Sequence, residues 1–254
     1  MRLTALPAFE DNYVWALAAG DGTAVMVDPG QAGPVLEAAA RGLEPAAILV
    51  THHHGDHVGG VRDLLDRWPH LPVFAPRDER LDFPYRAVAD GEAVDVAGRA
   101  FRVIEVPGHT RTHVAYFGEG VLFSGDTLFS LGCGRMFEGT PSQMLASLKR
   151  LAALPGTTQV CCGHEYTLSN ARFALQVDPS NAALQRRQQE AQAMRHAARP
   201  TLPISLESEL ATNPFLRTQA AEIRHAVAGR LGREPRDEVE VFAELRRWKD
   251  DFRA

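Results

Sequence analysis

Four histidines and an aspartate lie within one seven-residue segment of the sequence, THHHGDH: His52, His53, His54, Asp56 and His57. Imidazole nitrogens and carboxylate oxygens are ligands for Zn²⁺ and related divalent cations. In an extended segment, side chains alternate between two faces, so His52 and His54 point the same way and His53 points away. The glycine that follows permits a turn that brings Asp56 and His57 back toward the same space. The spacing therefore predicts two pairs of metal ligands, with His53 outside both.

Three further residues of ligand type follow apolar runs that end in glycine. They are His109 in EVPGHT, Asp126 in LFSGDT and His164 in VCCGHE. Glycine at these positions lets the backbone turn sharply and approach a site closely. One zinc ion takes about four ligands, so the full set predicts two metals. A carboxylate can bind two cations through its two oxygens, which makes Asp126 the expected bridging ligand.

The segments that must position these ligands alternate between strand and helix. Residues 13–19 and 23–28 are apolar, flank a Gly-Asp-Gly turn and predict a hairpin. Residues 46–51 predict a buried strand that leads directly into the histidines, and residues 58–68 resume helical periodicity. Many short strands with interleaved helices predict a layered α/β domain.

The composition changes near residue 167. Residues 168–254 contain segments of helical periodicity separated by Pro and Gly, and none of them has the alternation of a strand. We therefore expect one domain at 1–167, which contains the ligand-type residues, and a helical domain at 168–254.

The overall composition narrows the class of protein. A formal net charge of −5 does not favour nucleic-acid binding, because such proteins are more often basic. The N-terminus lacks the apolar run of a signal peptide, and no apolar run reaches the roughly 18 residues of a membrane span. Three cysteines, two of them adjacent, do not suggest a disulfide framework. We therefore expect a cytoplasmic, monomeric protein that binds neither nucleic acid nor membrane.

The motifs THHHGDH, PGHT, SGDT and CGHE, in this order, resemble those of the metallo-β-lactamase superfamily over roughly residues 1–165. The resemblance implies an αββα sandwich of two mixed sheets, with helices outside and a two-metal site at one edge. It also implies how the ligands are distributed. The first metal takes His52, His54 and His109, the second takes Asp56, His57 and His164, and Asp126 bridges them. We expect both ions to be zinc, although such ligands also accept Fe and Mn.

Further segments narrow the resemblance to the hydroxyacylglutathione hydrolase (glyoxalase II) family in its bacterial form. They are PAFEDNYVWAL, DTLFSLGCGRMFEGTPSQM, CCGHEYTLSNARFAL, NPFLR and LRRWKDDF. The implied reaction, the second step of methylglyoxal detoxification, hydrolyses S-(2-hydroxyacyl)glutathione such as S-D-lactoylglutathione to glutathione and D-lactate. The implied contacts to glutathione come from Arg135, Tyr166, Arg246 and Lys249. Phe137 stands where the animal enzymes have tyrosine, so it offers only apolar contact.

Thioester hydrolysis suits these residues. A water held by two cations has its pKa lowered toward about 7, so a bridging hydroxide is available as the nucleophile. Asp56 can hydrogen-bond this hydroxide and orient it. The leaving thiolate, with a pKa near about 8.5, needs no general acid. Glutathione carries two carboxylates that call for cations, although by themselves Arg246 and Lys249 are typical of a solvated helix face.

Two other activities of the superfamily stay open at this point. An iron-dependent persulfide dioxygenase would use one iron and leave His57 and His164 less needed. An RNA-processing nuclease would bind RNA in a salt-dependent manner, but the chain has no evident basic arm. The complete set of two-metal ligands favours the hydrolase.

Overall fold

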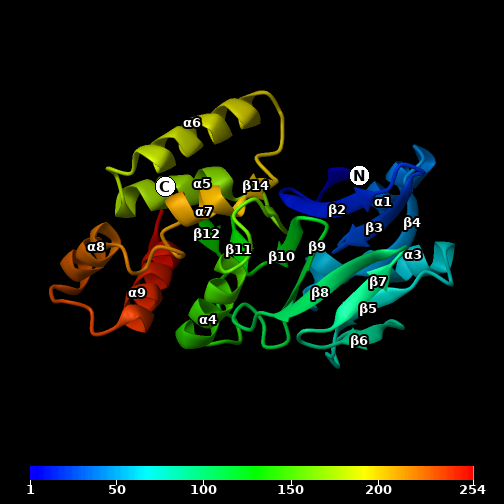
Figure 1. Ribbon diagram of the computed structural model, residues 1–254, viewed down its shortest axis with the longest axis horizontal. Coiled ribbons are helices and arrows are strands. Elements are labelled where there is room, and N and C mark those ends of the chain that lie inside the picture. The colour runs from blue at the N-terminus through cyan, green and yellow to red at the C-terminus, as the bar shows by residue number, and fades with distance from the viewer. Residues whose placement is uncertain (254) are drawn as a thin grey trace. The chain divides into compact units, whose positions relative to one another are not determined.

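The computed structural model describes residues 1–253, and Figure 1 shows its elements. The first sheet contains, in sequence order, β1 (Arg2–Ala8), β2 (Asn12–Ala18), β3 (Thr23–Val27), β4 (Glu44–Leu49), β5 (Val73–Pro76) and β6 (Arg86–Val88). β1, β2 and β3 pair antiparallel, and the strands from β3 to β6 pair parallel. The hairpin predicted for residues 13–28 is therefore confirmed by β2 and β3.

The second sheet has the strand order β14-β13-β10-β9-β8-β7. Its strands are β7 (Ala93–Val96), β8 (Arg99–Glu105), β9 (Val114–Gly118), β10 (Val121–Gly125), β13 (Gln159–Cys162) and β14 (Ile204–Ser205). The strands from β7 to β10 form an antiparallel meander. Buried and exposed residues alternate along the first part of β8, so one face of this strand packs against a core.

β14 shows that one prediction is wrong. The segment after residue 167 is expected to contain no strand, yet Ile204 and Ser205 pair antiparallel with Val160 and Gln159. A strand of two residues has no alternation that a sequence could reveal. Its conformation is fixed by pairing with a distant strand rather than by local propensity.

Buried polar contacts join the two sheets. Tyr116 in β9 is fully buried, and its hydroxyl oxygen lies 3.0 Å from the carbonyl oxygen of Val50 and 3.2 Å from that of Phe74. Trp15 in β2 donates from Nε1 to the carbonyl oxygen of Cys162 at 2.9 Å. Two sheets that face each other across an apolar core form the expected sandwich.

Three helices accompany the first sheet: α1 (Ala32–Ala40), α2 (Gly55–Val58) and α3 (Val61–Arg67). α1 packs against β1, β4 and α3. Its residues Val35 and Ala38 are buried in the same apolar cluster as Ile48 and Leu64. This packing fixes the direction in which the chain leaves β4 and enters the histidine segment.

The remaining elements begin with a hairpin of β11 (Leu128–Phe129) and β12 (Gly132–Cys133). The helices are α4 (Pro141–Ala152), α5 (Thr167–Val177), α6 (Ala182–His196), α7 (Leu206–Thr212), α8 (Ala221–Leu231) and α9 (Glu238–Asp251). α4 begins with a capping box in which Thr140 and Gln143 each accept from the other's backbone N–H. α9 packs against α4 and α8.

A buried carboxylate ties α7 to the β11–β12 hairpin. Glu209 accepts hydrogen bonds from the backbone N–H of Leu131 at 2.8 Å and from the side chains of Ser130 and Asn213, each at 3.0 Å. Burial raises the pKa of Glu209, and these hydrogen bonds oppose the rise. The loop that leads into β12 is thereby held in one conformation.

The chain forms two compact units that interleave along the sequence. Unit 1 comprises Met1–Glu105, Thr112–Gly125 and Cys161–His164. Unit 2 comprises Val106–Arg111, Asp126–Val160 and the described chain from Glu165 onward. Among residues 1–253, no helix combines the length and the apolar character needed to cross a bilayer.

Candidate metal centre

The histidine segment in unit 1 lies directly after β4. His52 is fully buried, and His54, in an extended conformation, is the N-cap residue of α2. Asp56 and His57 therefore lie within the single turn of this short helix. The strand leads through an extended segment into a helix. This helix begins at Gly55, where the sequence predicts only a turn, and the helix predicted for residues 58–68 corresponds to α3.

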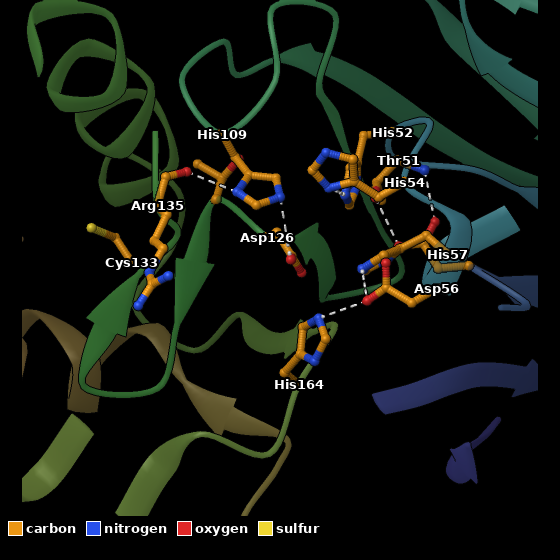
Figure 2. Close-up of polar contacts among 12 residues, drawn as sticks. Thr51, His52, His54, Asp56, His57, His109, Asp126, Cys133, Arg135 and His164 are labelled. Atoms are coloured by element: carbon orange, nitrogen blue, oxygen red, sulfur yellow. Dashed lines mark hydrogen bonds and ion pairs between the residues drawn. The ribbon is translucent and has the colours of Figure 1, made fainter. Parts of the chain in front are cut away.

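Five ligand-type side chains of unit 1 converge: His52, His54, Asp56, His57 and His164. Nε2 of His52 lies 3.1 Å from Nδ1 of His54. Oδ2 of Asp56 lies 3.7 Å from Nε2 of His57 and 3.3 Å from Nε2 of His164. The ligand atoms of Asp56, His57 and His164 are all within 4.8 Å of one another. Figure 2 shows that the imidazoles of His57 and His164 point toward the Asp56 carboxylate.

Asp28, which follows β3, orients two residues of the segment. Its Oδ1 accepts from the backbone N–H of Thr51 at 2.7 Å, and its Oδ2 accepts from Thr51 Oγ1 at 2.7 Å. The same Oδ2 lies 3.0 Å from Nδ1 of His57. Because a carboxylate can only accept, Nδ1 carries the proton and Nε2 of His57 keeps its lone pair. The sequence does not single out Asp28, because this aspartate follows its strand directly, without the glycine that precedes Asp126.

Two further histidines lie beside this cluster. His53 points to Asp78, with Nδ1 at 3.5 Å from Oδ2 of that carboxylate. His113 is fully buried and stacks on His52, with ring centroids 4.6 Å apart. His113 thus supports the ring of His52 from one side.

In unit 2, His109 and Asp126 face each other. Nε2 of His109 lies 3.4 Å from Oδ2 of Asp126, and its Nδ1 lies 2.8 Å from the carbonyl oxygen of Arg135. Figure 2 shows both contacts. A carbonyl oxygen can only accept, so Nε2 of His109 also keeps its lone pair. Gly134 is required here, because a Cβ atom at this position would lie 1.9 Å from the carbonyl oxygen of Asp126.

These donor sets fit divalent cations. At three places an imidazole Nε2 and a carboxylate oxygen are 3.3, 3.7 and 3.4 Å apart: His164 with Asp56, His57 with Asp56, and His109 with Asp126. For His57 and His109, Nδ1 is held by an oxygen acceptor, so two lone pairs approach each other. A cation between them converts this repulsion into attraction. The clusters therefore have the chemistry of a divalent metal site.

The residues for which the family resemblance implies contact with glutathione lie in unit 2. Arg246 in α9 is 5% exposed and donates to the carbonyl oxygen of Cys133 at 2.7 Å. It also donates to Oδ1 of Asp250 at 3.0 Å, and Nε of Arg135 lies 3.3 Å from the same oxygen. Arg246 therefore does not lie on a solvated helix face. Together with Lys249, one turn further along α9, these side chains carry an excess of positive charge.

Lys249 is strongly affected by its surroundings. It donates to Oγ of Ser169 at 3.3 Å. Burial, with repulsion from Arg246, Arg172 and Arg135, lowers the pKa of Lys249 to about 8. A bound anion would favour the charged ammonium and raise this pKa again. The cationic residues around Lys249 therefore suit an anionic ligand.

The aromatic residues implied in binding are accessible. Phe137 is 64% exposed, and its ring lies edge-on to His109 with centroids 5.2 Å apart. Tyr166, the N-cap residue of α5, is 37% exposed and packs edge-on against Phe129. Both rings can therefore contact a ligand.

Cys133 lies beside the guanidinium of Arg246, but its thiol is not a nucleophile at neutral pH. Burial raises the pKa of its thiol to about 11, and the nearby guanidinium of Arg246 opposes this only in part. The thiol therefore stays protonated. The backbone carbonyl oxygen of Cys133 accepts a hydrogen bond from Arg246, and the buried sulfur contributes to packing.

Two family models match consecutive parts of the chain. The model described as metallo-beta-lactamase superfamily matches residues 9–164, and the model described as hydroxyacylglutathione hydrolase C-terminus matches residues 165–252. A solved structure, the BLEG-1 B3 metallo-beta-lactamase, is 25% identical with a TM-score of 0.63, over 85% of this chain and 99% of that chain. The fold is thus the metallo-β-lactamase sandwich, followed by a helical C-terminal part.

Curated relatives match over the whole length. A protein named hydroxyacylglutathione hydrolase from Xanthomonas axonopodis pv. citri (strain 306) is 69% identical over 255 residues, covering 100% of both chains. A protein of the same name from Xylella fastidiosa (strain M23) is 64% identical over 252 residues, covering 99% of this chain and 98% of that one.

Proposed function

The chain belongs to the hydroxyacylglutathione hydrolase family of the metallo-β-lactamase superfamily, and we propose that it hydrolyses S-(2-hydroxyacyl)glutathione. The expected substrate is S-D-lactoylglutathione, and the products are glutathione and D-lactate. The observation that carries this proposal is identity of 64–69% to hydrolases of this name over essentially the whole chain. The alternative of an iron-dependent persulfide dioxygenase is not favoured, because the relatives that match the whole chain are named hydroxyacylglutathione hydrolases and residues 165–252 match the model of that family's C-terminus.

The proposed site binds two divalent ions. The proposed ligands of the first ion are His52, His54 and His109. Those of the second ion are Asp56, His57 and His164, and Asp126 bridges the two. The imidazole and carboxylate donors support zinc as the expected metal, with Fe or Mn as alternatives.

The chemistry follows from balancing the reaction. A water oxygen bonds to the thioester carbonyl carbon, the C–S bond breaks, and its electron pair leaves on the sulfur. Of the two protons of the water, one neutralises the thiolate and the other is released to solvent as the carboxylate forms. When bound, the cations supply a water whose pKa is lowered toward about 7 and a positive charge for the carbonyl oxygen. Asp56 can accept a hydrogen bond from the attacking water and orient it. A thiolate of pKa about 8.5 leaves without a proton donor.

Recognition of glutathione is assigned to Arg135, Tyr166, Arg246 and Lys249, with apolar contact from Phe137. The substrate has two carboxylates, and charge-assisted hydrogen bonds from Arg and Lys bind such groups strongly. The excess of positive charge around Lys249 supports this assignment. We thus propose that residues 1–167 carry the chemistry and contribute Arg135, Phe137 and Tyr166 to glutathione binding. Residues 168–254 complete the binding site with Arg246 and Lys249.

The proposed enzyme is a cytoplasmic monomer. Cys133, Cys161 and Cys162 are all buried and form no disulfide, which fits a reducing compartment. Sedimentation equilibrium of the purified protein tests the monomer, for which the expected mass is 27.8 kDa.

Thioester loss from S-D-lactoylglutathione, followed with metal-replete protein, tests the activity. We expect turnover far above the buffer background, its loss when a chelator removes the metals, and its return when Zn²⁺ is added. A lactoyl thioester of a small thiol without the glutathione peptide is the matched control and should react much more slowly. Turnover at the buffer rate would reject the hydrolase, whereas oxygen uptake with glutathione persulfide would point to the dioxygenase.

The lowered pKa of Lys249 predicts that KM depends on pH. Below its pKa of about 8 the ammonium is charged and binds a carboxylate, and above it the proton and the charge are lost. We expect KM to rise by about threefold to tenfold between about pH 7 and pH 9.5, since a charge-assisted hydrogen bond becomes a neutral one. In Lys249→Arg, whose guanidinium stays charged, KM should remain nearly flat. An equal rise in both proteins would contradict the role of Lys249.

A further inference from the structure

The turn between β1 and β2, formed by Phe9, Glu10 and Asp11, reaches residues of the second metal's proposed ligand set. We call these three residues, with Asn12 at the start of β2, the β1–β2 turn. It belongs to unit 1, as do Asp56 and His164. No motif in the sequence marks this turn as part of a metal site.

Asp11 holds His164. Its Oδ1 lies 2.8 Å from Nδ1 of the imidazole, and the carboxylate can only accept. Nδ1 of His164 therefore carries the proton, which leaves the lone pair on Nε2, the atom that faces Asp56. A carboxylate on the far nitrogen of a ligating histidine fixes both the tautomer and the orientation of the ring.

Asn12 holds Asp56. Its Nδ2 donates to Oδ2 of Asp56 at 3.0 Å and lies 3.4 Å from the backbone carbonyl oxygen of the same residue. Asn12 is buried, and its backbone forms an antiparallel bridge with His164. One residue thus fixes the carboxylate of Asp56 and also borders the histidine that faces it.

The turn is itself held firmly. Phe9 has a φ of 49°, a left-handed conformation that is costly for a bulky residue and needs support from its surroundings. Its backbone N–H donates to Oε1 of Gln31 at 2.8 Å. Gly30, next to Gln31, lies so close that a Cβ atom would be 1.8 Å from the carbonyl oxygen of Asp56 and 2.9 Å from the Phe9 ring.

From these contacts we infer that the β1–β2 turn is a positioning element for the second metal, in which Asp11 aims His164 and Asn12 aims Asp56. The inference rests on the ligand set of the proposed function. Asp11 and Asn12 act through the ligands and touch neither the reacting atoms nor the substrate. Removing either contact weakens the binding of one of the two metals and leaves the binding of the other unchanged.

Competition for Zn²⁺ between the metal-free protein and a chromophoric chelator tests this inference. For Asp11→Ala we expect one of the two Zn²⁺ ions to bind about tenfold more weakly. Removing a residue that hydrogen-bonds a metal ligand typically weakens metal binding by about 10- to 100-fold. We expect the lower end of this range because the Asp11 carboxylate is 41% exposed. Asp11→Asn keeps an acceptor but loses the charge, so its affinity should fall between those of Asp11→Ala and the unmodified protein. Asn12→Ala should weaken the same ion.

Asp21→Ala is the matched control. Asp21 lies in the neighbouring turn between β2 and β3, where its Oδ1 accepts from the backbone N–H of Thr23 at 2.9 Å. The Asp21→Ala protein should bind both ions as the unmodified protein does. The thermal unfolding of each metal-free variant, compared with that of the unmodified protein, separates a loss of positioning from a loss of fold.

The outcomes distinguish the inference from its premise. If the unmodified protein binds fewer than two Zn²⁺ ions, the proposed ligand set fails and the inference fails with it. If it binds two, and Asp11→Ala and Asn12→Ala bind both equally well, the inference alone is overturned. Selective weakening of one ion in folded variants supports it.

Discussion

We expect Asp126→Ala to lower kcat/KM for S-D-lactoylglutathione by about 10³-fold, since several kcal/mol of metal-derived stabilisation depend on the bridging ligand. Asp126 is buried, and its Oδ2 lies 3.4 Å from Nε2 of His109. Alanine removes both carboxylate oxygens and therefore a ligand from each proposed metal. The protein should accordingly contain fewer than two metals per chain after dialysis against a weak chelator.

Metal content and kinetics must be measured on the same samples. Asp63→Ala, which removes an exposed aspartate in the first turn of α3, is the matched control and should leave both unchanged. Normal metal content in Asp126→Ala would contradict the bridge. Normal metal content with lost activity would assign Asp126 to the reaction itself.

The second large effect concerns recognition of the substrate. We expect Lys249→Met to raise KM by about 10- to 100-fold with little change in kcat, because a charge-assisted hydrogen bond contributes about 1.5–3 kcal/mol. Methionine keeps the length of the side chain and its contact with the Phe173 and Phe252 rings. It removes the charge and the N–H donors, including the one that contacts Oγ of Ser169. Steady-state kinetics over a range of S-D-lactoylglutathione concentrations separates the two constants.

Lys149→Met is the matched control for this substitution. Lys149 is a half-exposed lysine of α4 that pairs with Glu238, so its loss should not affect KM. Arg246→Ala should also raise KM, but it additionally leaves the carbonyl oxygen of Cys133 without the 2.7 Å contact. We therefore expect it to lower the unfolding temperature as well. A fall in kcat with unchanged KM for Lys249→Met would contradict a binding role.

The sequence singles out the proposed ligands because their signals are local. An apolar strand, a glycine and a ligand-type residue follow one another at His109, Asp126 and His164, and alternation alone separates His53 from its neighbours. The structure directs His53 to Asp78. These patterns depend on backbone geometry over a few residues, which a single chain displays directly.

The residues that support the ligands leave no such signal. Asp11, Asn12 and Asp28 are common polar residues at turns and strand ends, and only the packed fold brings them to the imidazoles and the carboxylate. For the same reason, the sequence does not reveal that Arg246 is buried. An arginine on an amphipathic helix is usually solvated, and here a carbonyl oxygen from the β11–β12 hairpin makes its burial possible.

The contact between Asp11 and His164 spans 153 positions of the sequence. At about 5–20 residues per second, Asp11 is synthesised roughly 8–30 s before His164. A nascent chain therefore carries its early histidines for many seconds before the last proposed ligand, His164, and its oriented tautomer are available. We expect the second ion to load only after the ribosome has passed residue 164, so chains stalled earlier should retain at most one tightly held metal.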